Sequence, residues 1–154
     1  MTYLLLKTLH IISAAVLLGT GAGIAFFMFM AHRSRDLQAL RVATRHVVLA
    51  DWLFTAPAVV VQPLTGFWLM HILGWRIGSG WMHAVLGLYV LVGCCWIPVV
   101  WIQHRLAREV NAATSIELLG EAYWRLYRIW FALGVPAFVA VLLLVWLMVA
   151  KPWL

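Results

Sequence analysis

The sequence predicts an all-α fold, a four-helix bundle that spans a membrane. Of the 154 residues, 66% are hydrophobic and only 10% are charged, whereas a soluble domain is near half apolar and about a quarter charged. The mean hydropathy of +0.98 excludes a soluble globular enzyme and a disordered chain. A helical span needs about 20 apolar residues, and each span must be helical because hydrocarbon offers no partner to backbone polar groups.

Four apolar stretches are long enough to cross, and together they predict a single membrane domain over residues 1–154. They cover residues 4–31, 48–72, 81–102 and 127–149. The three prolines of the second and fourth stretches are expected to bend these spans, because proline cannot complete the helical hydrogen-bond ladder. They are Pro57, Pro63 and Pro136.

The positive charges are concentrated in two long connections, residues 32–46 and 104–125. Eight of the 11 Lys and Arg residues lie in or beside them: Arg33, Arg35, Arg41, Arg45, Arg105, Arg108, Arg125 and Arg128. The positive-inside rule therefore predicts that both connections are cytoplasmic and both chain termini periplasmic. Helix can continue into these connections, with a break at residues 111–115 and Ser115 as a cap. Because the net charge of +6 sets topology, no nucleic-acid partner is expected.

Six histidines form two layers at the ends of the first three spans. The outer layer is His10, His71 and His83, and the inner layer is His32, His46 and His104. Each span carries one histidine at either end, on nearly the same helical face, and the two are about 31–38 Å apart at 1.5 Å per residue. An ionisable residue in a membrane span indicates function by default.

The outer layer predicts a b-type haem, whose iron takes a neutral imidazole on each axial face. His10 is the first ligand because it lies about two turns inside its span, and His83 or His71 opposes it. Two imidazole ligands leave no open iron position, so electron transfer is favoured, with a quinone or another redox partner. The chain is then expected to be a redox protein of the membrane. The sequence does not decide whether it is also an oxidoreductase enzyme.

Three glycines, Gly19, Gly21 and Gly23, lie at mid-membrane in the first span. Gly19 and Gly23 form a small-xxx-small pair, which lets a neighbouring helix or a flat cofactor approach closely. Four short helices also leave enough free surface for a homodimer.

Copper is an alternative to haem at the outer layer. Met70–His71 and Met82–His83 flank one short connection, and thioether with imidazole suits Cu(I). A third interpretation leaves these histidines bonded to water, backbone or lipid headgroups. For the inner layer this interfacial role is favoured over a second haem.

The remaining chemistry-bearing residues have simpler explanations. Asp51 lies at the start of the second span, where its negative charge is expected to interact with the helix N-terminus dipole and to pair with a loop arginine. The alternative is a role in a proton relay. Cys94 and Cys95 are adjacent core residues and form no disulfide framework. The sequence holds no nucleotide-binding loop, no HExxH and no Ser/His/Asp pattern, which leaves a hydrolase or an ATP-driven protein without support.

Three segments resemble a superfamily of small four-helix membrane proteins. LKTLHIISAAVLLGTGAG…AH at residues 6–32 is similar to the superfamily that includes inner-membrane copper-resistance D-type proteins and the haem-containing protoporphyrinogen IX oxidases of bacteria. DWLFTAPAVVVQPLTGFWL at residues 51–69 resembles a family of uncharacterised predicted integral membrane proteins within it. GWMHAVLGL at residues 80–88 resembles the start of the third span of the oxidases. The resemblance covers the first three spans.

The resemblance implies haem b, a bacterial inner membrane, and functional roles for His10 and His83, with a weaker case for His32. The oxidase pattern has a lysine two residues after the third-span histidine, where this chain has Val85. It also has an arginine late in the first span.

Phe26 and Phe27 stand at that arginine's position in this chain. Basic residues there would hold the propionates of a porphyrinogen. Their replacement by apolar residues argues against oxidase activity.

Overall fold

The computed structural model describes residues 1–75, 78 and 80–151. In this part of the chain the regular structure is helical, and four helices are long and apolar enough to cross a membrane, which confirms the predicted fold class. The elements are α1 (Thr2–Ser34), α2 (Leu37–Ala50), the π-helical η1 (Asp51–Thr55), α3 (Ala56–Leu73), α4 (Gly80–Ala112), the 3-10 helix η2 (Ile116–Leu118) and α5 (Glu121–Ala150).

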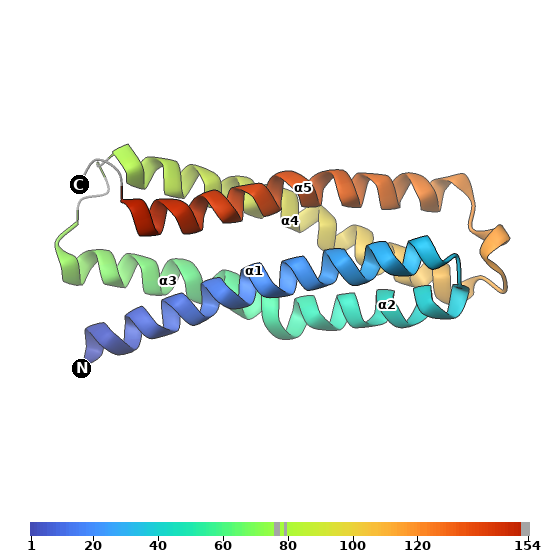
Figure 1. Ribbon diagram of the computed structural model, residues 1–154, viewed down its shortest axis with the longest axis horizontal. Coiled ribbons are helices and arrows are strands. Elements are labelled where there is room, and N and C mark those ends of the chain that lie inside the picture. Colours follow the sequence, from blue (N-terminus) through green and yellow to red (C-terminus); the bar gives the residue numbers. More distant parts are fainter. Residues whose placement is uncertain (76–77, 79, 152–154) are drawn as a thin grey trace.

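The helices pair along their length and gather at one end of the bundle. α1 packs along α3, α4 packs along α5, and α2 contacts both α1 and α4 (Figure 1). The main hydrophobic core lies where these elements meet, and its largest buried members include Met28, Leu40, Leu106 and Tyr123. The start of α1 and the end of α5 lie at the opposite end from this core (Figure 1). Which end faces the periplasm stays a prediction from the charges.

The connection at residues 32–46 is almost entirely helical, which agrees with the expectation that helix continues into it. Only Arg35 and Asp36 separate α1 from α2. The Asp36 carboxylate accepts a hydrogen bond from the Gln38 backbone N–H at 2.9 Å, which satisfies one of the unpaired donors at a helix start. The second span therefore runs from Leu37 to Leu73 as one helical segment. The buried face of α2 is formed by Leu40, Thr44 and Val47.

The second long connection is also shorter than expected, although its break falls close to the expected place. α4 continues to Ala112, and α5 begins at Glu121. Ser115 is the N-cap residue of η2, but its hydroxyl makes no capping hydrogen bond. Both changes lengthen the helices beyond the apolar stretches, because their polar ends still bury one face against the core.

Arg41 of α2 holds the C-terminal end of α4. Its Nη2 donates to the Ala113 carbonyl at 2.6 Å, and its Nε donates to the Val110 carbonyl at 3.4 Å. The last carbonyls of a helix lack partners within the helix. Arg41→Met keeps the apolar stem and is expected to lower the free energy of unfolding by about 1–3 kcal/mol, measured by denaturation in detergent micelles. Arg45→Met on the same helix is the control, and an equal loss in both would contradict the capping role.

Pro57 explains the π-helical segment in the second span. In η1 the Ala56 N–H bonds to the Asp51 carbonyl, five residues earlier. Proline has no N–H to donate, and its ring crowds the carbonyl four residues earlier, so the preceding turn widens. The π-helical turn is a local widening of the second span, and the expected bends stay predictions. Pro63 and Pro136 lie inside α3 and α5, which stay helical through them.

Candidate functional site

His10 lies between α1 and α3, where side chains of α3 hold both of its ring nitrogens. Its Nδ1 is 2.8 Å from Thr65 Oγ1, and its Nε2 is 3.2 Å from Gln62 Nε2. The Ser13 hydroxyl, one turn further along α1, donates to Gln62 Oε1. These four side chains, the His10 network, join the first two spans through polar contacts.

The hydrogen bonds of the His10 network determine which nitrogen carries the proton. Thr65 Oγ1 donates its own proton to the Val61 carbonyl at 2.7 Å, so it accepts a hydrogen bond from His10 Nδ1–H. The Gln62 amide nitrogen donates to Nε2, since its oxygen already accepts from Ser13. The imidazole is thus neutral with its lone pair on Nε2, the form in which histidine ligates metals.

Gly66 lets His10 approach α3 closely. A Cβ built on Gly66 would lie 3.3 Å from His10 Cε1, so a side chain there would press on the imidazole. Sequence reasoning missed Gly66, Gln62 and Thr65. The available signal was the pair of polar residues three apart in an apolar span, which places both on one helical face.

The three glycines of α1 face open space, so within the described part of one chain no neighbouring helix approaches Gly19, Gly21 or Gly23 closely. A Cβ at any of them would meet nothing within 4 Å. The reason is that α1 meets its neighbours through other residues, including Ser13, Met28 and His32. A cofactor at these glycines stays a prediction.

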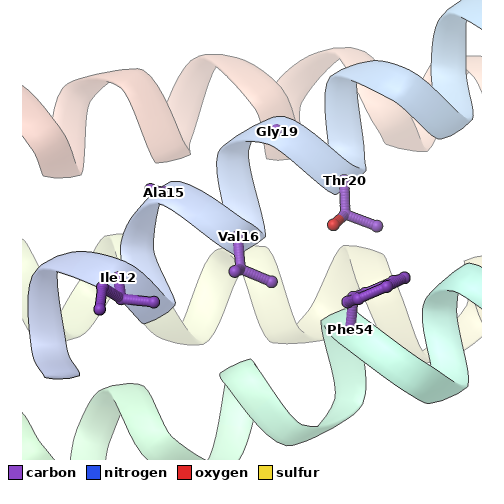
Figure 2. A pocket seen from close by; sticks show the side chains of 6 residues that line it. All are labelled: Ile12, Ala15, Val16, Gly19, Thr20 and Phe54. Carbon is purple, nitrogen blue, oxygen red and sulfur yellow. The ribbon is translucent and has the colours of Figure 1, made fainter.

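Gly19 instead lines an apolar groove of about 480 Å³ between α1 and η1. In Figure 2, Val16 and Thr20 of α1 point toward Phe54, which forms the opposite wall. The groove is lined by Ile12, Ala15, Val16, Gly19, Thr20 and Phe54. His10 is not among its lining residues.

The other two outer histidines, His71 and His83, are exposed. The methionines that precede them, Met70 and Met82, are buried in a cluster with Trp81. A copper ion bound by both Met-His pairs would require the thioethers to leave this cluster. Among the described residues no three His, Cys, Asp or Glu side chains are grouped to hold a metal ion, so one chain does not bring the three outer histidines together.

His32 of the inner layer is buried among aromatic rings. Its Nδ1 donates to the Met28 carbonyl at 2.7 Å, and the Tyr123 hydroxyl donates to its Nε2 at 2.9 Å. The Tyr127 ring stacks on the imidazole with 3.6 Å between centroids, and Trp124 meets it edge-on. Both nitrogens are satisfied, and the arrangement ties α1 to α5.

The other inner histidines have separate surroundings. His46 is exposed on α2, while His104 on α4 is partly buried. His104 Nδ1 donates to the Val100 carbonyl at 2.8 Å, and the Trp52 indole donates to its Nε2 at 3.4 Å. The structure therefore spreads the inner layer over three helices and does not gather it around one ligand.

Asp51 is buried, with only 4% of its surface exposed. The expected position at a helix N-terminus is wrong, because the 14 residues of α2 precede it without a break. The expected pairing with an arginine is wrong too: the ion pair in the described part of the chain joins Arg105 to Glu109 at 3.9 Å.

Comparison with known proteins agrees with this architecture. Neither the curated proteins nor the solved structures include a match to the chain. A family model described as "Predicted integral membrane protein (DUF2269)" matches residues 4–152, which include all four spans. The chain therefore belongs to the DUF2269 family of predicted integral membrane proteins.

Proposed function

We propose that this chain is a b-type haem protein of the membrane, with His10 as one axial ligand and a role in electron transfer. The observation that carries the proposal is the pair of contacts that hold the two ring nitrogens of His10 against α3. Its Nδ1–H is directed to Thr65 Oγ1 at 2.8 Å, which leaves the lone pair on Nε2. Metal-ligating histidines are oriented by this kind of hydrogen bond from the other ring nitrogen.

The residues around His10 fit one axial position of a haem. Thr65 would orient the imidazole, and Gly66 would let it lie close to α3. His10 Nε2 would bind the iron in place of its 3.2 Å contact with the Gln62 side chain. The second ligand would be His83 or His71, which are both exposed.

A bound haem supplies one-electron redox chemistry, and its partner would be a quinone or another redox protein of the bilayer. The groove of Figure 2 is an apolar surface along α1, and its lining residues follow His10 closely in the sequence. The eight arginines at the other end of the bundle support, by the positive-inside rule, an orientation with His10 toward the periplasmic side of a bacterial inner membrane.

The test is a visible absorption spectrum of the detergent-purified protein, oxidised and then reduced with dithionite. We expect a Soret band with sharp reduced α and β bands, as for a low-spin b-type haem with two imidazole ligands. His10→Ala should lose these bands. Thr65→Val, which keeps the shape of the side chain, should weaken haem affinity by about 10–100-fold.

His46→Ala is the matched control, since His46 is exposed and far from His10 along the bundle. It should leave the spectrum unchanged. A colourless protein from haem-replete cells would overturn the proposal, and copper in such a preparation would support the Met-His alternative. A His10→Ala protein that keeps a full Soret band would show that the haem is held elsewhere.

A further inference from the structure

The π-helical segment η1 turns an acidic side chain into the interior of the bundle. Asp51 begins this segment and is 4% exposed. The other four acidic residues of the chain, Asp36, Glu109, Glu117 and Glu121, lie at the surface or are partly exposed. π-helical turns are rare and occur frequently at functional sites, so the surroundings of Asp51 call for a physical explanation.

Three polar side chains from two helices surround the Asp51 carboxyl. Thr55 lies one turn ahead in η1, and Trp96 and Gln103 reach it from α4. Each is near the carboxyl, yet four buried atoms of the group have no hydrogen-bond partner. They are Asp51 Oδ2, Thr55 Oγ1, Trp96 Nε1 and Gln103 Oε1. Nine-tenths or more of buried polar groups in proteins are paired, so four orphans in one place indicate a site.

Burial of Asp51 without a Lys or Arg partner in the described part of the chain favours a protonated carboxyl. His104 of α4 is the titratable residue whose charge reaches Asp51 in the described part of the chain. On its own helix the preceding Arg45 and His46 are exposed, and α1 presents only uncharged residues between His10 and His32. An ionised carboxylate buried without a cation is strongly disfavoured.

A proton on Asp51 also corrects the hydrogen-bond count. The acid O–H can donate to Gln103 Oε1, which otherwise accepts nothing. The Trp96 indole N–H and the Thr55 hydroxyl can donate to the carboxyl oxygens in either protonation state. Gln103 Oε1 is the orphan atom that the proton accounts for, because it needs a donor and an ionised Asp51 offers none.

We infer that Asp51, Thr55, Trp96 and Gln103 form an intramembrane proton-binding site that exchanges its proton with the cytoplasmic side through His104. In the exchange, the O–H bond of the Asp51 acid breaks and an N–H bond forms on His104 by way of water, without electron transfer. The product is a carboxylate beside an imidazolium. The site is separate from the His10 network, and the inference does not rest on haem.

His104 has the right protonation pattern for this role. Its Nδ1–H is used by the Val100 carbonyl at 2.8 Å, so Nε2 is the nitrogen that can accept a proton. Nε2 receives only a long contact from the Trp52 indole, at 3.4 Å. His104 is partly exposed, whereas Asp51 is buried, so the imidazole has the access to the surface that the carboxyl lacks.

The test is infrared spectroscopy of the full-length protein in lipid at neutral pH. We expect a C=O stretching band of a protonated carboxylic acid that disappears in Asp51→Asn. Glu117→Gln is the matched control, because Glu117 is exposed, and it should leave the band in place. The difference between each variant and the unaltered protein removes contributions from any other carboxylic acid.

Gln103→Leu keeps the acid and tests its partner. If Gln103 Oε1 accepts the acid proton, the band should shift to higher wavenumber in this variant, which also covers the case in which Asp51→Asn fails to fold. In D₂O, His104→Ala should slow the deuterium shift of the band, while His46→Ala should not. An unaltered rate in His104→Ala would overturn the exchange route.

The proposal is overturned if folded Asp51→Asn and the unaltered protein have the same carboxylic-acid region, since Asp51 is then ionised. It is likewise overturned if Na⁺ in place of choline raises the thermal stability of the unaltered protein but not that of Asp51→Asn, which would identify a cation site. These outcomes are independent of the visible spectrum, so the haem proposal and the proton site can fail separately.

Discussion

Replacing Tyr123 by alanine is expected to lower the free energy of unfolding by about 3–5 kcal/mol. Tyr123 is fully buried in the core cluster, so its removal leaves a cavity that the surrounding helices can fill only in part. The change also removes the hydroxyl that donates to His32 Nε2 at 2.9 Å. A buried ring nitrogen without a partner adds its own cost.

The measurement is thermal or denaturant unfolding in detergent micelles, followed by far-UV circular dichroism. Tyr123→Phe is the matched control, because it keeps the ring and removes only the hydroxyl, and it should cost about 1 kcal/mol. If Tyr123→Ala and Tyr123→Phe unfold at the same point, packing at this position is not what joins α1 to α5.

Replacing Trp81 by alanine should destabilise the other end of the bundle by a similar amount, about 3–5 kcal/mol. Trp81 is fully buried at the start of α4. It packs against Met70 of α3 and Leu147 of α5, and its ring meets Trp75 edge-on with 5.3 Å between centroids. It therefore connects the second, third and fourth spans near the end opposite the main core.

Trp68→Ala is the control for this prediction, since Trp68 is 56% exposed and faces outward. The same unfolding measurement should show little change for it. Trp81→Phe should cost less than Trp81→Ala, because the indole Nε1 has no hydrogen-bond partner and its removal leaves nothing unpaired. Equal losses for Trp81→Ala and Trp68→Ala would contradict the assigned packing.

The fold class could be predicted from the sequence because it depends on local properties. An apolar stretch long enough to cross hydrocarbon must be helical, because its backbone groups find hydrogen-bond partners only within the helix. The four expected spans lie within the four observed ones. The helix ends could not be predicted so well. Asp36 and Leu40 were available as signs of a helix start at α2, but hydropathy ends a span where polar residues begin, whereas a helix continues as long as one face is buried.

The candidate site could be predicted only in part. His10 was identifiable as an ionisable residue in a span. Its partners Gln62 and Thr65 lie 52 and 55 positions away, and only helix pairing brings them together. Gly66 was missed for the same reason. The prediction for the glycines at positions 19, 21 and 23 depends on their spacing alone, and spacing does not say which face of a helix meets a neighbour.

By itself the sequence determined that this protein is a four-span helical membrane protein, and it indicated a topology from where its arginines lie. Both follow from the cost of burying polar groups and charges in lipid, which acts on each residue separately. The tertiary structure alone decided that His10 is held by α3, that His32 is stacked among aromatic rings, and that Asp51 is enclosed with Gln103. These are contacts between helices, and in lipid the choice of contacting faces depends on how side chains of several helices fit together rather than on hydropathy.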